Sequence, residues 1–437
     1  MTENNNFQDF QDLAKRETIS SDSLKLPAKR EAVSFAKEHI NDDPLELLLH
    51  KQRYPNVDIE FAVQQMEGLR TASEKWPSLL HYGNYLYPPR LNREQASSDE
   101  TAFHKADIIQ SLYSERRHQL SIADLTGGMG IDSIAFAKIP DAEVDYVECN
   151  AELCQLMEHN RSALGLSNIT AHCGDSIEWL RNCKKKYNII FIDPARRDTH
   201  GKKVAAFEDC TPNILEHKAV LTEHCDFLMV KASPMMDIDK GIAQLCNVSD
   251  VYVVAVKGEC KELLFLCGGQ REEPLIHCQN IIPGDSIYSN DPFTRSQEAQ
   301  AEAVYCTSVG RYIYEPDASL MKGGPYKLLS DEWGMQKLAR NTHLYTSDNY
   351  HGWMGRTFCV LKEVSPNKKA IAALIPDGKA HVIVRNYPAR AEELQRQLGL
   401  KEGGDLFVIA TTVGTRKTGF ICCEPENYQH FLAEINK

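Results

Sequence analysis

The chain has 437 residues, of which 42% are hydrophobic and 25% charged, and these proportions indicate a globular protein of about two to four domains. Its net charge of −12 argues against indiscriminate binding to nucleic acid. No apolar run reaches the roughly 18 residues that a membrane-spanning helix needs. No signal peptide is visible, so we expect a cytoplasmic protein whose 14 cysteines are free thiols.

The negative charge is unevenly distributed along the chain. Residues 326–437 contain 15 Lys and Arg against 12 Asp and Glu, a net charge of +3, which leaves −15 for the rest. A balanced solvated surface would give a similar count. This C-terminal quarter is nevertheless the better candidate for contact with an anionic partner.

The N-terminal part is predicted to be helical after a disordered tail at residues 1–20. Apolar residues at helical spacing indicate a small helical domain over residues 21–92, in which Asp42 and Asp43 precede a helix start at Pro44. Another helix is expected to run to about residue 116, with Ser98 or Asp99 as its N-cap.

Strand and helix patterns then alternate. Strands are expected at 122–125, 143–148, 169–172, 188–193 and 226–231, and helices at 151–164, 176–183, 212–221 and 237–246. Two more strands, 251–256 and 262–267, would form a closing hairpin. This alternation predicts an α/β fold with a doubly wound parallel sheet. A glycine-rich turn after the first strand would let a ligand approach the backbone.

The regular alternation stops after residue 270. Residues 271–325 are expected to form a small α+β module with a helix at 296–303 and a strand at 308–314. Residues 326–437 are expected to form a further α/β domain. Its expected strands are 356–361, 380–385, 406–412 and 419–423, and its expected helices are 332–340, 389–398 and 426–435.

Acidic side chains stand at or just after the carboxyl ends of the first four strands, where an open parallel sheet binds its ligand. They are Asp124, Glu148, Asp175 and Asp193. Each alone is also an ordinary helix cap or loop residue. Together they suit S-adenosyl-L-methionine, since Glu148 could accept the ribose hydroxyls, Asp175 could meet the adenine amino group, and Asp124 could face the cationic methionine tail.

A nicotinamide dinucleotide is the rival ligand. It would need Gly-x-Gly-x-x-Gly, and the turn Gly127-Gly-Met-Gly130 has no third glycine in phase. The closing hairpin also favours a methyltransferase sheet. The full set expected to bind the methyl donor is Asp124, Thr126, Gly127, Gly128, Gly130, Glu148, Cys149, Asp175, Ser176 and Asp193.

The helix before the first strand is a candidate cover for the methionine tail. Gln95, Ser98 and Thr101 lie at its start, with Lys105 one turn on, although simple capping by Ser98 would explain the pattern equally well. Lys261-Glu262 in the closing hairpin is expected to point towards the same pocket.

Four segments resemble the motifs of class I methyltransferases: Asp124–Asp132, Val147–Asn150, Cys173–Asp175 and Asp193–Arg196. Four more resemble a bacterial methyltransferase family with a C-terminal THUMP-like domain preceded by a small ferredoxin-like module: Val230–Met235, Gly258–Leu263, His343–Ser347 and Arg385–Pro388.

This likeness covers residues from about 30 to the end. It implies a Rossmann-like class I methyltransferase sheet with an N-terminal helical region and C-terminal α+β modules. The methyltransferase domain would be residues 93–270, the ferredoxin-like module 271–325 and the THUMP-like domain 326–437. THUMP domains elsewhere bind tRNA, so the resemblance also implies an RNA partner.

Asp193-Pro-Ala-Arg196 stands where amino methyltransferases have Asp/Asn-Pro-Pro-aromatic. In those enzymes the acid and the proline carbonyl accept hydrogen bonds from the target amine. Ala195 departs from the second proline, and Arg196 replaces the aromatic residue, although an arginine can stack on a base or bind phosphate. We therefore expect Asp193, Pro194 and Arg196 to be catalytic.

Substrate contacts are expected from Arg196, Arg197, Lys231 and Ser233. A surface ion pair is the alternative for the two arginines, and Lys231 could simply extend from its strand end towards water. Uridine C5 methylation needs a cysteine nucleophile just after the fifth strand. Ser233 stands in that region without an adjacent base, which argues against that reaction.

The leading hypothesis is an S-adenosylmethionine-dependent methyltransferase of a base nitrogen in tRNA or rRNA, with no metal. Two alternatives stay open. The acceptor could be a small molecule or a protein, which the net charge of −12 favours. The altered Asp193 motif could instead belong to a catalytically degenerate RNA-binding or scaffold protein.

Overall fold

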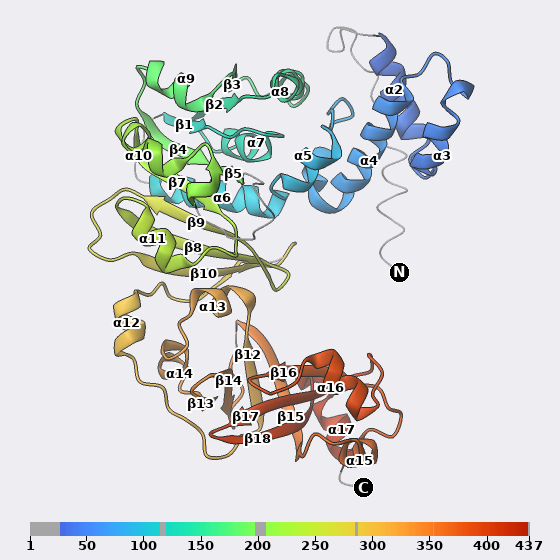
Figure 1. Cartoon of the computed structure of the whole chain (residues 1–437), viewed down its shortest axis with the longest axis vertical. Helices are drawn as coiled ribbons and strands as arrows, with labels where there is room; N and C mark the ends of the chain where they lie inside the picture. The colour runs from blue at the N-terminus through green and yellow to red at the C-terminus, as the bar shows by residue number, and fades with distance from the viewer. Residues whose placement is uncertain (1–26, 114–118, 197–206, 285–286, 353, 436–437) are drawn as a thin grey trace. The chain divides into compact units, whose positions relative to one another are not determined.

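The computed structural model describes residues 27–113, 119–196, 207–284, 287–352 and 354–435 (Figure 1). The chain divides into two compact units. Residues up to Val248 together with Phe265–Gln270 form the first unit, and Ser249–Leu264 together with the residues from Arg271 onwards form the second unit.

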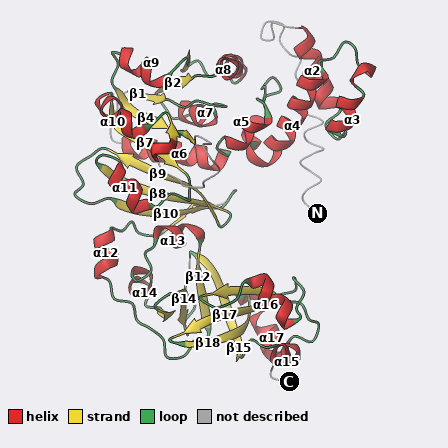
Figure 2. Cartoon of the chain, viewed as in Figure 1, coloured by secondary structure: helices red, strands yellow, loops and turns green. Residues whose placement is uncertain are grey.

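Helices make up the N-terminal part of the first unit (Figure 2). They are α2 (Pro27–Glu38), α3 (Pro44–Leu49), α4 (Ile59–Lys75), α5 (Arg90–Gln95) and α6 (Asp99–Tyr113). Asp43 and Asp58 cap α3 and α4, since their carboxylates accept hydrogen bonds from backbone N–H groups of the first turn. The helical character expected here is confirmed for the described residues, and α3 begins at Pro44 as predicted.

Hydrogen bonds fix this helical segment internally and to α8 (Ala151–Ala163). Asn160 Oδ1 accepts from Leu86 N at 2.9 Å, and Asn160 Nδ2 donates to Leu86 O at 2.9 Å. Trp76 Nε1 donates to Ser97 O at 2.7 Å, and both Trp76 and Asn160 are buried. Buried polar groups that are satisfied in this way fix the position of the segment that carries them.

The main sheet has nine strands in the order β11-β10-β8-β9-β7-β4-β1-β2-β3. Their bounds are β1 (Leu120–Asp124), β2 (Ala142–Glu148), β3 (Ile169–Cys173), β4 (Tyr187–Ile192), β7 (Cys225–Ala232), β8 (Val248–Val256), β9 (Glu259–Cys267), β10 (Leu275–Ile281) and β11 (Ile287–Ser289). Strands β1, β2, β3, β4 and β7 run parallel. Their carboxyl ends therefore meet at one edge, and the predicted α/β sheet is confirmed.

Helices connect the parallel strands of this sheet. They are α7 (Ile131–Ala137), α8 (Ala151–Ala163), α9 (Ser176–Asn182), α10 (Ile214–Glu223) and α11 (Ile238–Gln244). A short two-stranded sheet, β5 (Ala195–Arg196) with β6 (Cys210–Thr211), follows β4. Strand β4 is buried from Ile189 to Ile192, as expected of a central strand covered on both faces.

The expected hairpin of β8 and β9 is present, but the sheet does not end there. Lys257 and Gly258 make its two-residue turn, both with positive φ (51° and 77°), which suits the twist of the strands. Beyond it, β10 pairs in parallel with β8, and β11 pairs antiparallel with β10. Residues 275–289, expected within the α+β module at 271–325, therefore continue the main sheet, and their mixed polarity is that of strands near a sheet edge.

The second unit contains a seven-stranded sheet in the order β13-β14-β12-β15-β18-β17-β16. Its strands are β12 (Tyr312–Pro316), β13 (Gln336–Ala339), β14 (Thr342–Ser347), β15 (Gly355–Val364), β16 (His381–Arg385), β17 (Leu406–Val413) and β18 (Arg416–Cys423). The helices of this unit are α12 (Arg295–Gln300), α13 (Ala318–Gly323), α14 (Leu328–Glu332), α15 (Lys368–Leu374), α16 (Ala391–Leu398) and α17 (Tyr428–Ile435).

The prediction of a helix at residues 332–340 was wrong. Helix α14 ends at Glu332, and Gln336–Ala339 is strand β13. Lys337 N donates to Val304 O at 2.8 Å, and Cys306 N donates to Lys337 O at 3.0 Å. Pairing with a segment distant in sequence has overridden the local pattern, which is the usual way in which propensity fails.

The second sheet has a core on each face. Phe420 and Cys422 of β18 pack with Ile313 and Phe358 on one side, while Ile421 packs on the other with residues of α15 and α16. This alternation follows from the period of two in a strand. Across the described ranges, no helix is long and apolar enough to cross a membrane.

Candidate functional site

The glycine turn after β1 is held against β2. Gly127 N donates to Val147 O at 3.0 Å, and Tyr146 Oη donates to Gly128 O at 2.7 Å. A Cβ at position 127 would lie 2.2 Å from the Tyr146 ring, and Gly128 and Gly130 have φ of 52° and 84°. Only glycine therefore fits this turn at position 127 without displacing the ring.

Asp124 ends β1 with a side chain that is only 1% exposed. Its Oδ1 accepts from Thr126 N at 3.1 Å, and its Oδ2 accepts from Ser133 Oγ at 2.6 Å. Burial raises the pKa of this carboxyl to about 7. The carboxyl thus braces the glycine turn against α7, and its expected contact with a methionine tail stays a prediction.

Glu148 ends β2 beside the same turn. Its Oε2 accepts from Gly128 N at 2.8 Å, while its Oε1 accepts from Asn150 N at 2.8 Å and from the exposed Cys149 Sγ at 3.3 Å. The two oxygens of a carboxylate offer about four acceptor positions. Glu148 therefore retains capacity for a ligand hydroxyl while it fixes the turn.

Asp175 and Ser176 lie at the end of β3, next to Glu148. Gly174 N donates to Glu148 O at 2.9 Å, so the segments after β2 and β3 are adjacent. The exposed Asp175 caps α9 by accepting from Glu178 N at 2.7 Å, and Ser176 is buried. Asp175 therefore acts as an ordinary helix cap. Its expected contact with adenine stays a prediction.

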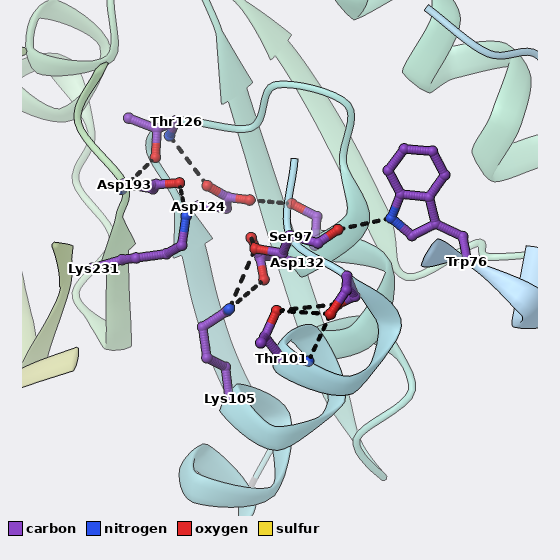
Figure 3. Close-up of polar contacts among 11 residues, drawn as sticks. Trp76, Ser97, Thr101, Lys105, Asp124, Thr126, Asp132, Asp193 and Lys231 are labelled. Atoms are coloured by element: carbon purple, nitrogen blue, oxygen red, sulfur yellow. Dashed lines mark hydrogen bonds and ion pairs between the residues drawn. The ribbon is translucent and has the colours of Figure 1, made fainter. Parts of the chain in front are cut away.

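Asp193 lies directly after β4 and contacts Thr126, which follows β1, and Lys231 of β7 (Figure 3). Its backbone N–H donates to Thr126 Oγ1 at 2.7 Å, and its Oδ2 forms an ion pair with Lys231 Nζ at the end of β7. Both side chains are partly buried. Lys231, expected to contact substrate, thus pairs with Asp193 in this structure.

The residues that follow Asp193 and Lys231 are more peripheral. Pro194 is buried, the backbone of Arg196 pairs with Cys210 in the β5–β6 sheet, and Arg197 lies outside the described residues. Ser233 Oγ accepts from Met235 N at 3.2 Å. Ser233 therefore shapes the turn after β7, which agrees with the argument against a nucleophile there.

The start of α6 forms a network above α7 (Figure 3). Ser97 Oγ donates to Asp132 Oδ2 at 2.8 Å, and Lys105 Nζ lies 3.1 Å from Asp132 Oδ1. Ser98 Oγ accepts from Thr101 N at 3.4 Å, which supports the capping interpretation of Ser98. Gln95 is the last residue of α5.

The pair Lys261-Glu262 belongs to the second unit. Lys261 Nζ contacts Glu259 Oε2 at 2.6 Å, and Glu262 is buried in β9. The expected orientation of these two residues towards the methyl donor stays a prediction.

Two family models match the C-terminal part of the chain. A ferredoxin-like domain matches residues 312–352, and a THUMP domain-like family matches residues 355–425. The ferredoxin-like match overlaps the expected module at 271–325 only over residues 312–325. The boundaries expected from the sequence stay predictions.

Known proteins resemble a larger part of the chain. A crystal structure from Porphyromonas gingivalis W83, of a protein proposed to be a methyltransferase, has a TM-score of 0.80 and 28% identity, covering 91% of this chain and 98% of that one. Uncharacterized S-adenosylmethionine-dependent methyltransferases of Mycobacterium tuberculosis strains CDC 1551 and H37Rv are 20% identical over 243 residues. That match covers 54% of this chain and 64% of each relative. The chain therefore spans less than two thirds of the length of these relatives.

The chain therefore resembles methyltransferases over most of its length, and its C-terminal part matches ferredoxin-like and THUMP-like domains. Its relatives imply S-adenosyl-L-methionine as the methyl donor.

The strand edge of this methyltransferase-like protein fits that cofactor. Glu148 retains acceptor capacity for a diol. The space beside Gly128 is open, since a Cβ added there would meet only Thr126 O within 4 Å. The four strand-end acids favour a sulfonium cation over a phosphate. In the parts of the chain that the structure describes, no cluster of three or more His, Cys, Asp or Glu could hold a metal ion.

Sequence reasoning missed the Ser97–Lys105–Asp132 network of the methyltransferase-like protein. Lys105 has no exposed side-chain surface, although lysine is almost always a surface residue. The available signal was Asp132 itself, an acid in the first turn of a helix two residues after Gly130. Nothing local could identify its partners, since they precede it by 27 and 35 residues.

Proposed function

We propose that this protein transfers a methyl group from S-adenosyl-L-methionine to a base nitrogen of structured RNA, either tRNA or rRNA. The observation that carries this proposal is the position of Asp193 and Pro194. They end β4 beside the glycine turn, where Thr126 fixes the backbone and Lys231 fixes the carboxylate. The THUMP-like match and the net charge of +3 over residues 326–437 support an RNA substrate.

The bound cofactor supplies an activated methyl on a sulfonium, and the protein supplies orientation. In this proposal the Asp193 carboxylate and the Pro194 carbonyl accept hydrogen bonds from the target amine, which aims its lone pair at the methyl group. The N–C bond forms as the C–S bond breaks, and the amine then loses a proton to solvent. Alignment of the two reactants accounts for most of the catalysis.

Glu148 and the glycine turn would hold the adenosine part of the cofactor. Glu148→Gln should weaken cofactor binding about 10- to 100-fold, because hydrogen bonds to a charged acceptor contribute roughly 1.5–3 kcal/mol each. Glu143→Gln is the matched control, since Glu143 is exposed on the same strand. Isothermal titration calorimetry measures both, and a lack of cofactor binding by the wild type would rule out the methyltransferase.

The substrate class is tested by transfer of a labelled methyl group to an extract of a strain that lacks the protein. RNA, protein and small molecules are then separated, and the nucleosides are identified by mass spectrometry. A methylated base that disappears with Asp193→Ala supports the proposal. Label that enters protein or small molecules instead favours the second candidate acceptor, which is consistent with the acidic edge. Cofactor binding without any methyl transfer would favour the alternative that the protein is a catalytically degenerate RNA-binding or scaffold protein.

A further inference from the structure

The second unit contains a cavity of about 830 Å³ beside β10 and α13, within the size range of small-molecule sites. Helix α13 packs closely against β10 (Figure 1). A Cβ added at Gly323 of α13 would lie only 2.2 Å from Cys278 Sγ of β10. The polar and aromatic residues that line the cavity and carry the following argument are Lys257, Asn280, Tyr288, Asp317, Arg356 and Arg385.

Two acceptors in this lining are buried and lack a partner. Asp317 Oδ2 and Asn280 Oδ1 have no hydrogen-bond partner among the residues that the structure describes. Asp317 is 8% exposed, and its other oxygen is used by Leu320 N at 2.9 Å and Ser319 Oγ at 2.8 Å. Buried acceptors without donors are costly, so a ligand that supplies two N–H groups would be stabilised here.

The same cavity has a fixed cationic side. Glu315, whose side chain is 5% exposed, accepts from Arg356 Nε at 2.7 Å and forms an ion pair with Arg385 Nη2 at 2.5 Å. One buried carboxylate thus orients two guanidinium groups whose side chains are about half exposed, which leaves a positive charge for an anion. Arginines arranged in this way suit phosphate, and Lys257 adds to the charge.

An aromatic side chain stands beside the acceptors. Tyr288 of β11 is the register partner of Asn280 of β10, so their side chains project from the same face of the strand pair. The remaining wall includes the apolar residues Pro316, Met321 and Met354. A planar ring could stack on this surface, whereas the three cationic side chains argue against a metal ion.

We propose that this cavity binds one nucleotide whose base carries an exocyclic amino group. The exocyclic amino group donates its N–H groups to Asp317 and Asn280, and the phosphate lies against Arg356 and Arg385. The amino group of adenine, cytosine or guanine carries two N–H bonds and can donate to both acceptors, while uracil has a single N–H. The inference rests on the proposed RNA substrate for the source of the nucleotide, but the binding itself needs no methyl transfer.

The test uses the full chain, with S-adenosylhomocysteine added to occupy the donor site, and titrates 5′-CMP and 5′-UMP by nuclear magnetic resonance. CMP should bind at least about tenfold more tightly than UMP, because UMP leaves one buried acceptor unpaired. Asp317→Asn keeps the capping oxygen but presents a donor in place of Oδ2. This variant should lose at least about tenfold in CMP affinity and reverse the preference.

Asp58→Asn is the matched control, because Asp58 caps α4 in the same way and does not line the cavity. Equal binding of CMP and UMP, an unchanged Asp317→Asn variant, or no nucleotide binding would overturn the proposal. If circular dichroism shows that Asp317→Asn does not fold, Arg385→Gln serves as the deciding variant. It should weaken CMP binding and leave cytidine binding unaffected, and equal effects on both would overturn the phosphate assignment.

A single-stranded cytidine hexanucleotide separates the two sources of the nucleotide. Tighter binding of the hexanucleotide than of CMP identifies an RNA strand, and equal binding identifies a free nucleotide. CMP binding with no methyl transfer would refute the proposed function alone, whereas transfer without CMP binding would refute this site alone.

Discussion

Lys105 Nζ lies 3.1 Å from Asp132 Oδ1, although the lysine side chain has no exposed surface and the aspartate side chain is 13% exposed. The lysine comes from α6 and the aspartate from the first turn of α7, directly after the glycine turn. Ser97 accepts from Lys105 Nζ at 3.3 Å and donates to Asp132 Oδ2 at 2.8 Å. This network fixes the helix before β1 over the helix that follows the turn.

Removal of one partner from this pair should be strongly destabilising. Lys105→Met leaves the Asp132 charge without its cation, and we expect a loss of about 3–5 kcal/mol in the free energy of unfolding. Urea denaturation followed by circular dichroism measures the loss. Lys51→Met is the control, because the Lys51–Glu60 pair is 56% and 72% exposed, and should cost less than about 1 kcal/mol. Similar losses in both variants would contradict a structural role for Lys105.

Asp124 should make stability depend on pH. Its pKa is raised to about 7 by burial, against roughly 3.9 in an unfolded chain. The folded state therefore binds the proton more tightly, and the stabilisation that protonation provides is lost as the pH rises from about 4 to 7. Asp124→Asn cannot ionise and can still accept from Thr126 N.

The comparison of wild type and Asp124→Asn isolates this group. Over that pH range the wild type should lose up to about 4 kcal/mol relative to the variant, since each unit of pKa shift corresponds to about 1.4 kcal/mol. Urea unfolding at several pH values gives the difference. Parallel curves for the two proteins would show that Asp124 is not the titrating group.

The sheet and its edge could be predicted from the sequence for local reasons. Continuous apolar runs such as Ile189–Ile192 mark buried strands, and an acid at a strand end stays at the carboxyl edge whatever its neighbours are. The ion pair between Asp193 and Lys231 could not be predicted, because it depends on the adjacency of β4 and β7. Lys231 was expected to contact substrate or extend into water, and neither interpretation included its partner.

Residues near sheet edges were harder to predict for the same reason. In strand β10 the polar residue His277 finds its partner on another strand, since its Nε2 lies 2.8 Å from Asp250 Oδ1 of β8. Segment 336–339 is a strand because of its pairing with β14 and with Val304. In both cases distant segments, not local periodicity, decide the conformation.

Thr126 should affect methyl transfer through Asp193. Its Oγ1 accepts the Asp193 N–H at 2.7 Å, so Thr126→Val leaves this donor without its acceptor and releases the segment after β4. We expect kcat to fall about 10- to 100-fold, because a small misplacement of an aligned group is costly. Thr126→Ser keeps the hydroxyl and should retain most activity. Cofactor titration separates the two effects, and a loss confined to cofactor affinity would refute positioning of Asp193.

Gly127 should tolerate no side chain while Tyr146 occupies its present position. An added Cβ would lie 2.2 Å from the buried Tyr146 ring, so Gly127→Ala should cost about 1–3 kcal/mol or more of stability. Gly352→Ala is the control, since nothing lies within 4 Å of its added Cβ. A double-mutant cycle identifies the cause. Tyr146→Phe keeps the ring and should leave the Gly127→Ala penalty unchanged, while Tyr146→Ala should reduce it. If Gly127→Ala costs the same stability in the Tyr146→Phe and Tyr146→Ala proteins, then the backbone conformation, and not the Tyr146 ring, requires glycine at position 127.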